Sequence, residues 1–450
     1  MAAAMLSLGV HLVHAVLAVA GMAALARWAA SDRSDRLVWA VTIAVSAVVA
    51  ALLFKASGPP NRFEDFTDAY LAAGRAVLDG PEALRPMLEE GVHGFVNLPI
   101  VAYLFAPFAL LGDTLAGLAF FALGGVAVVA AWAIIARRYA FSRVESVVSL
   151  FALACFGPLL YSLKEGNTSH ILLAGLAWGV VLVAARRDLL AGVVFAAAAI
   201  IKPPLLLIGV YYALRGRLRV ALGGLALCVV SVLASLAVFG LDMHVLWLSE
   251  FRAYSGLPMP GFNVQSFAAA AARFELGPGS YRDWSPHDLA LVGRVASWGL
   301  VLILAAAGVW ASVRAPGRLP RGQTADELEF YALLAFICVA STVSWMHYYV
   351  WLLPGFAAAL AATRAGTGLT SARRYLIAAF VLTAPLERLG PLSETGAFGP
   401  LTNIVVSHLL IGGVVTFGLL AWLRAGAPGS ASGSVSGNVS GGALDPGLGR

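Results

Sequence analysis

The stretch from Leu115 to Ala136, LAGLAFFALGGVAVVAAWAIIA, decides the class of fold. It contains no charged residue, and Arg137 and Arg138 follow it directly. A helix of about 20 apolar residues is long enough to cross the ~30 Å hydrocarbon layer of a membrane. The pattern therefore predicts a transmembrane helix that ends at a basic connection.

The composition of the whole chain agrees with this interpretation. Of its 450 residues, 60% are hydrophobic and 12% are charged, and the mean hydropathy is +0.84. A soluble domain carries about 25% charged residues, so a water-soluble globular enzyme is excluded. Weak alternation of apolar and polar residues also argues against an outer-membrane β-barrel. We expect an all-α, polytopic bundle of transmembrane helices.

Similar apolar runs recur along the chain and predict about 13 spans, with roughly 11 to 14 allowed. The other runs are Leu6–Ala26, Leu37–Phe54, Leu98–Leu111, Val144–Leu163, Ser169–Ala185, Leu189–Ile201, Leu205–Leu214, Val220–Phe239, Leu289–Val313, Leu328–Trp345, Tyr349–Ala362, Leu376–Ala384 and Asn403–Leu423. Residues 1–424 are thus expected to form one transmembrane domain. The Gly/Ser-rich residues 425–450 are expected to be a disordered cytoplasmic tail.

Basic residues occupy the short connections between these runs, which the positive-inside rule assigns to the cytoplasm. They account for the net charge of +6 without a nucleic-acid partner. The rule then places the long connections 55–97 and 240–288 outside. It also requires an odd number of crossings between Asn97 and Arg137, so Leu98–Leu111 and Leu115–Ala136 do not both span the membrane. The sequence leaves that conflict open.

Cysteine chemistry is not expected to stabilise this chain. Cys155, Cys228 and Cys338 lie inside apolar runs, and their spacing fits neither a disulfide framework nor a zinc site. They are interpreted as small buried apolar residues. The first run has no basic segment before it, so it is expected to be a retained span rather than a cleaved signal.

Lys202 is the sharpest candidate for a functional residue. It follows the run that ends at Ile201 and precedes Pro203 and Pro204, which break the helix and free backbone groups to face a cavity. An ionisable residue at membrane depth is a functional-site hypothesis by default. The alternative is a lysine that reaches to the interface from a helix end, but that leaves the Pro-Pro break unexplained.

The segment NRFEDFTDAY, residues 61–70, carries three carboxylates just after a predicted span. The spacing over Asp65–Leu78 predicts a short amphipathic helix at the membrane interface, with Asp65 and Asp68 on one face. A carboxylate at such a boundary can act as a general base for a hydroxyl group. A solvated charged face is the equally good alternative.

His347 lies in SWMHYY, residues 344–349, at the same predicted depth as Lys202. Its imidazole can bind a sugar hydroxyl or a phosphate, and the flanking aromatic residues suit either stacking on a sugar or an interfacial belt. A structural histidine is the alternative. The sequence has no P-loop or HExxH motif, so soluble nucleotide chemistry has no support.

Several short motifs occur along the chain in the same order as in a known protein family. They are Asp65-Phe66 with Tyr70–Ala73 and Gly80, Phe95–Pro99 with Phe105–Phe108, Glu165–Asn167, Ala199–Pro203 and Ser344–His347. In this order they resemble the GT-C glycosyltransferases, and more narrowly glycosyltransferase family 87, which includes polyprenol-phosphate-mannose-dependent α-1,2-mannosyltransferases of actinobacteria. The Glu165–Asn167 turn lacks the glutamine of the family's Gly-Gln-x-Asn pattern, which bears on sugar or acceptor specificity.

The resemblance implies a GT-C fold and an inverting transfer of a sugar, in the first instance mannose, from a polyprenyl-phosphate donor. By motif position Asp65 takes the role of general base, with Asp68 next and Glu64 third. Cations must offset the charge that develops on the leaving phosphate. Lys202 and His347 are the expected donor-phosphate ligands; Arg252 and Arg282 are possible helpers in the second long connection.

The resemblance also implies the partners and the location. The expected acceptor is a lipid or glycan hydroxyl at the outer face of a bacterial inner membrane, and membrane lipid is a further partner. The residues expected to bind the sugar or the acceptor are Glu64, Tyr70, Glu165, Asn167, Asn263 and Trp345. No cofactor is expected, although a divalent metal between Asp65 or Glu64 and phosphate stays open.

Two other classes of function are alternatives to a glycosyltransferase. A transporter or flippase also has many spans with buried charges, but it usually shows paired repeats, and we find no convincing duplication. A second enzyme class would transfer a lipid-linked pentose such as arabinose, or a phosphorylated group. A metal-dependent phosphotransferase would need more clustered His and Asp ligands than these connections offer.

Overall fold

The structure, a computed structural model, describes residues 2–56, 63–91, 94–313, 325–365, 370–385 and 399–426. Over these residues the regular structure is helical, apart from one isolated β-bridge between Val264 and Trp345. The all-α class predicted from the sequence is confirmed. Nearly all of the predicted tail, residues 425–450, lies outside the described residues.

Six of the described helices are long and apolar enough to cross a membrane. They are α1 (Ala2–Ala29), α2 (Asp35–Ala56), α6 (Asp113–Arg138), α12 (Leu218–Ser255), α14 (Leu291–Val313) and α20 (His408–Gly426). Helices α7 (Arg143–Ala154) and α8 (Gly157–Glu165) meet at a bend of 50° and form a seventh span if they are taken together.

The helices formed by most of the other apolar runs are shorter than a membrane span. They include α9 (Ser169–Ala184), α10 (Asp188–Ile201), α11 (Leu207–Leu214), α15 (Ala325–Ala340), α16 (Leu353–Ala362) and α17 (Thr370–Thr383). At about 1.5 Å per residue, none of them reaches the ~30 Å of a hydrocarbon layer. The count of about 13 spans is therefore not confirmed; length and composition support six or seven in the described part of the chain.

Residues 98–111 form only two short helices, η4 (Pro99–Leu104) and α5 (Ala106–Ala109). Prolines near the first residue of each helix supply no backbone N–H donor for an earlier turn. Both helices are too short to span a membrane. The conflict left by the sequence is thus resolved in favour of α6 as the one span in this region.

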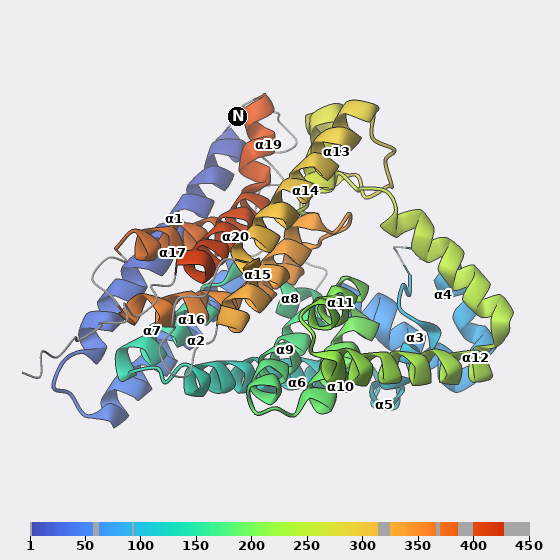
Figure 1. Cartoon of the computed structure of the whole chain (residues 1–450), viewed down its shortest axis with the longest axis horizontal. Helices are drawn as coiled ribbons and strands as arrows, with labels where there is room; N and C mark the ends of the chain where they lie inside the picture. Colours follow the sequence, from blue (N-terminus) through green and yellow to red (C-terminus); the bar gives the residue numbers. More distant parts are fainter. Residues whose placement is uncertain are drawn as a thin grey trace, which may run out of the picture.

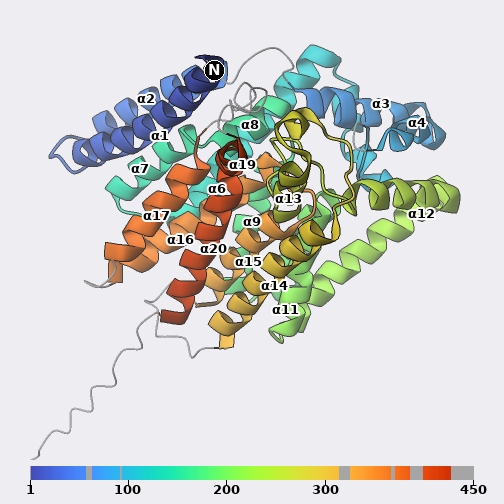
Figure 2. The same ribbon diagram turned by 90° about the horizontal axis from the view of Figure 1, so that it is seen from above.

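The first long connection folds as a chain of short helices. The predicted helix over Asp65–Leu78 is present as η1 (Asp65–Leu71), which has π geometry, followed by α3 (Ala72–Asp79). After it come η2 (Pro81–Leu84) and α4 (Arg85–Glu89). Figures 1 and 2 both show α3 and α4 beside α12, on the side of the molecule away from α1 and α2.

Helix α12 continues beyond the predicted end of its run. Gly240 interrupts it with φ 72° and ψ 172°, values that favour glycine because it has no Cβ. The helix then resumes to Ser255, and Figure 1 shows its two arms meeting at an angle. The predicted loop 240–288 therefore begins with a helical arm and also contains α13 (Phe267–Leu276) and η6 (Pro278–Arg282).

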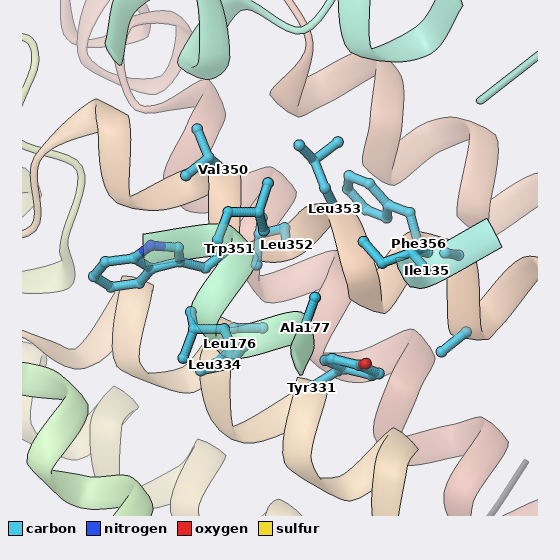
Figure 3. Packing of buried hydrophobic residues seen from close by; sticks show 14 of the residues in the cluster. Ile135, Leu176, Ala177, Tyr331, Leu334, Val350, Trp351, Leu352, Leu353 and Phe356 are labelled. Carbon is cyan, nitrogen blue, oxygen red and sulfur yellow. The ribbon is translucent and has the colours of Figure 1, made fainter. Parts of the chain in front are cut away.

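The core is centred on η7 (Met346–Leu352), all of whose residues are buried. Figure 3 shows Val350, Trp351 and Leu352 packed against side chains of α6, α9 and α15. The Trp351 indole N–H donates to the carbonyl of Ser169 over 3.2 Å. The segment that carries His347 is thereby held by close packing, the main source of stability between helices in lipid.

The two ends of the helices differ in chemistry. At one end, ion pairs join the ends of neighbouring helices: Arg143–Asp35, Arg138–Glu327, Arg364–Glu145, Arg215–Glu329 and Arg424–Glu329. The opposite ends of α9, α10 and α15 surround a cavity. There α15 is followed by η7. The short helix η8 (Thr363–Ala365) carries Arg364 and belongs to the ion-paired end, and α19 (Pro400–Val406) precedes α20.

Candidate active site

The cavity has a volume of about 990 Å³ and collects most of the residues singled out by the sequence. Those that line it are Glu64, Asp65, Asp68, Tyr70, Glu165, Asn167, Lys202, Asn263, Trp345 and His347. They come from segments up to hundreds of residues apart in the chain. Arg252 and Arg282 are not among its lining residues, and both side chains are exposed elsewhere.

The wall that carries the carboxylates is anchored by two aromatic residues of η1. Phe66 stacks on Phe120 with ring centroids 4.3 Å apart, and Tyr70 stacks on Phe105 at 4.6 Å. These contacts fix the buried face of η1, so its other face presents Asp65 to the cavity. π-Helical turns of this kind occur frequently at functional sites.

Asp65 is oriented by the turn after α8. The Asn167 amide Nδ2 donates to Asp65 Oδ2 over 2.6 Å, while its own Oδ1 accepts from the backbone N–H and the hydroxyl of Ser169. Gly166 makes this approach possible: its φ is +65°, and a Cβ there would lie 2.6 Å from the Phe66 Cβ. The turn therefore holds the Asp65 carboxylate at one position.

The electrostatics of Asp65 are set by opposing effects. Burial raises the pKa of Asp65, the Asn167 hydrogen bond and the positive charge of Lys202 lower it, and the charges of Glu64 and Asp68 raise it again. The net direction is upward. A carboxylate with a raised pKa is a stronger base, which suits proton abstraction near neutral pH.

Lys202 lies at the break between α10 and η5 (Pro203–Leu206), as its sequence context suggested. It is only 7% exposed, so its ammonium group does not reach outward as an interfacial lysine would. The Nζ atom lies 5.3 Å from the centre of the Tyr348 ring. Asn97 Nδ2 donates to the Ile201 carbonyl over 2.6 Å and satisfies the end of α10.

His347 has unused hydrogen-bonding capacity. It is 4% exposed, and neither Nδ1 nor Nε2 has a hydrogen-bond partner among the described residues. Its ring is nearly parallel to those of Trp345 and Tyr161, at 6.3 and 6.4 Å. Because buried polar atoms are nearly always paired, two orphaned nitrogens beside a cavity are available to a ligand.

The segment before His347 is tied to the second long connection. Gln265 N donates to Ser344 O over 2.6 Å, and Met346 N donates to Asn263 O over 2.8 Å. The Asn263 side chain donates to the Tyr161 hydroxyl over 3.0 Å and accepts from the Trp284 indole over 2.7 Å. One asparagine thus joins three walls of the cavity.

Sequence reasoning missed several lining residues, among them Tyr161, Tyr254 and Trp284. Tyr161 lies inside an apolar run, where no local signal marks it as different from a core aromatic residue. Tyr254 and Trp284 belong to an aromatic-rich part of the second connection, and that enrichment was a usable signal.

One end of the cavity is apolar and open to the side of the bundle. It is lined by Leu207 of α11, Trp298 and Val301 of α14, and Phe336 and Ile337 of α15. Leu207 is 41% exposed and Trp298 is 62% exposed, so the cavity wall continues onto the outer surface of the helices. Such an opening fits a hydrocarbon chain that lies partly in the membrane.

The site offers no ready-made metal centre. Within the residues that the structure describes, no group of three or more His, Cys, Asp or Glu side chains is arranged to hold a metal ion. Glu165 is instead 3.6 Å from the ammonium of Lys164, and Asp68 accepts from the Thr67 hydroxyl over 2.8 Å. Besides its four carboxylates, the cavity is lined by one ammonium group, that of Lys202, and one imidazole, that of His347.

Comparisons with known proteins add an independent result. The profile described as "Glycosyltransferase family 87" matches residues 95–344. Over 327 residues, 64% of this chain and 67% of the relative, the sequence is 30% identical to the polyprenol-phosphate-mannose-dependent alpha-(1-2)-phosphatidylinositol mannoside mannosyltransferase of Mycolicibacterium smegmatis. No solved structure matches the chain. The profile match includes Lys202 and Asn263 but not Asp65 or His347.

Proposed function

Because the chain belongs to glycosyltransferase family 87, and is therefore a membrane glycosyltransferase, we propose that it transfers a mannosyl group from a polyprenyl-phosphate donor to a lipid or glycan hydroxyl. The donor is the one named for the mycobacterial relative. The observation that carries the proposal is the cavity in which Asn167 orients Asp65 while Lys202 and the unpaired His347 lie on other walls. The transporter alternative has no comparable support.

Asp65 is the general base of this reaction. Asn167 binds Oδ2, which leaves Oδ1 for the acceptor hydroxyl. As the hydroxyl oxygen attacks the anomeric carbon, its proton moves to Asp65, and the bond between that carbon and the phosphate oxygen breaks with its electrons on the phosphate. A single displacement of this kind inverts the anomeric configuration.

The other two carboxylates of the segment 61–70 are weaker candidates for the base. Asp68 and Glu64 line the same cavity, but their side chains are exposed, so water stabilises their charge. Asp68 also accepts a hydrogen bond from its neighbour Thr67. We assign both to the wall that receives the acceptor, together with Tyr70 and Glu165.

Lys202 and His347 bind the donor phosphate. The leaving group is a phosphate ester, so it needs positive charge and hydrogen-bond donors more than a proton. The ammonium group of Lys202 supplies the charge, and either nitrogen of His347 can donate once protonated. Arg252 and Arg282 have no part in this assignment because they do not line the cavity.

The donor's polyprenyl chain leaves through the apolar opening between α11, α14 and α15. The ion-paired, arginine-rich helix ends lie at the opposite end of the bundle, where the positive-inside rule places the cytoplasm. We therefore propose that the reaction takes place at the outer face of a bacterial inner membrane.

The test is turnover by the purified protein in detergent or liposomes. Radiolabelled polyprenyl-phosphate mannose and polyprenyl-phosphate arabinose are offered separately with a lipid extract, and the products are separated and digested with linkage-specific mannosidases. Label in a mannosidase-sensitive glycolipid supports the proposal. If label is transferred only from the arabinose donor, the transferred sugar is a pentose and not mannose. Transfer from neither donor overturns the proposal.

A further inference from the structure

The wall formed by the second long connection carries aromatic surface that the proposed chemistry does not use. Tyr254, Phe262 and Trp284 all line the cavity. Trp284 packs against Gly261, where a Cβ would come within 2.5 Å of the indole nitrogen. Phe262 meets the same indole edge-on, with ring centroids 5.9 Å apart. The indole is thus fixed in place with part of its surface toward the cavity.

Asn263 gives this aromatic wall a polar edge. Its amide uses one donor on Tyr161 and one acceptor site on Trp284. A primary amide has two N–H donors and two acceptor lone pairs, so one of each remains. A flat aromatic ring beside a spare amide donor and acceptor is the combination that binds a sugar, whose C–H face packs on the negative face of a π system while its hydroxyls form hydrogen bonds.

The position of Trp284 separates it from the opening assigned to the donor's polyprenyl chain. Trp284 lies between η6 and α14, outside the membrane-spanning helices, whereas the apolar opening for the donor chain is lined by residues inside α11, α14 and α15. The cavity volume of about 990 Å³ is at the upper end of the range for small-molecule sites, roughly 300–1,000 Å³. There is room beyond the transferred sugar and its phosphate.

We propose that Trp284, with Phe262 and Asn263, forms a subsite for a second sugar ring of the acceptor, next to the ring whose hydroxyl is attacked. The preferred acceptor is then a glycoside of at least two sugar units. This inference rests on the proposed function and names a property of the acceptor that the catalytic residues do not determine.

The experiment compares acceptors of different length. The probes are octyl α-mannoside and the octyl glycosides of two- and three-mannose chains, with radiolabelled polyprenyl-phosphate mannose as donor. The wild-type protein is expected to show a KM for the two-mannose acceptor about five- to tenfold below that for the one-mannose acceptor, the range that one aromatic contact supplies. A third mannose adds little.

Trp284→Leu removes the aromatic face. It is expected to raise the KM for the two-mannose acceptor about five- to tenfold, to raise that for octyl α-mannoside much less, and to leave the KM of the donor within twofold. Trp284→Phe keeps a ring and retains most of the preference. The matched control is Trp178→Leu, on an exposed part of α9 away from the cavity, which retains the wild-type preference.

Distinct outcomes overturn the inference. Equal KM values of the wild-type protein for one- and two-mannose acceptors exclude the subsite, and so does a Trp284→Leu effect that falls on the donor or equally on all acceptors; in each case the proposed function stands. Failure of the wild-type protein to transfer mannose to any acceptor overturns both. If Trp284→Leu does not fold, Trp284→Met, which keeps the bulk but not the ring, decides the same question.

Discussion

The two ends of the helical bundle both gather charged side chains, but they treat them differently. At the arginine-rich end, carboxylates are neutralised directly: Glu327 pairs with Arg138, Glu145 with Arg364, and Glu329 with both Arg215 and Arg424. At the cavity end, Asp65 and Lys202 influence each other through space but form no salt bridge among the described residues.

This contrast indicates that the charged groups at the arginine-rich end stabilise the fold, whereas those at the cavity end take part in binding and reaction. A pair in direct contact satisfies both groups, so neither is available to a ligand, and removal of one partner leaves the other unpaired. In the cavity, by contrast, the carboxylate of Asp65, the ammonium group of Lys202 and the imidazole of His347 form no direct pair with one another among the described residues, and other residues hold them in place. Substitutions at the two ends should therefore affect different measurements.

The largest expected effect is at the proposed base. Asp65→Asn keeps the size of the side chain but removes the proton acceptor, so kcat is expected to fall about 10²- to 10⁴-fold, with donor binding retained. Steady-state transfer and a donor-binding assay measure the two quantities. Asp68→Asn is the matched control and should lose less than about tenfold; full activity of Asp65→Asn with an inactive Asp68→Asn would move the base to Asp68.

The next effect concerns the leaving phosphate. Lys202→Met keeps the length and the packing of the side chain without its charge, and should lower kcat/KM for the donor about 10²-fold. Lys164→Met is the comparison, since Lys164 is paired with Glu165 and does not line the cavity. Unchanged donor kinetics in Lys202→Met would show that the phosphate is neutralised by other groups.

The sequence was sufficient for the class of fold and for the charged side chains and the histidine that line the cavity. Lys202 and Asp65 could be predicted because ionisable groups are costly near a membrane and because each lies beside a clear break in an apolar run. Basic residues in the short connections likewise predicted which ends of the helices carry charge. These features could be predicted from local sequence because each depends on residues that are adjacent in the chain.

The number of spans and the aromatic walls depend on packing between distant segments. Apolar runs such as Ser169–Ala185 indicate burial but do not distinguish lipid from a neighbouring helix, which is why α9 and α10 were predicted as spans. Arg252 and Arg282 belong to the second long connection, which favours a role at the site, but the helical arm of α12 and the turn at η6 leave neither side chain among those that line the cavity. Tyr161 meets Asn263 across 102 positions, a contact that no spacing reveals.

The arginine-rich end should affect stability rather than chemistry. Glu327→Ala removes the partner of Arg138 and the acceptor for Tyr139, and it is expected to cost about 2–3 kcal/mol, less than a fully buried pair because Arg138 is partly exposed. Thermal unfolding in detergent measures the loss. Asp113→Ala breaks the exposed pair with Arg75 and should cost under about 1 kcal/mol. A Glu327→Ala protein that stays stable but loses kcat would contradict the division between the two ends.

The smallest expected effect is a shift in pH dependence at the cavity end. The Asn167 hydrogen bond favours the charged form of Asp65 and so lowers its pKa against the larger upward effect of burial. Asn167→Ala should therefore raise the pKa of Asp65 further, because a hydrogen bond to the charged form is lost, so that the acidic limb of the kcat profile moves to higher pH.

Above that limb Asp65 is ionised in both proteins, and the remaining difference in rate should be small. Asn97→Ala is the informative comparison, because Asn97 also lines the cavity but donates to the Ile201 carbonyl rather than to Asp65. Its rate can change, but its acidic limb should stay where the wild-type limb is. An acidic limb that does not move in Asn167→Ala would mean that the group titrating in the profile is not Asp65, and the contrast between a paired end and an open catalytic end would then need another base.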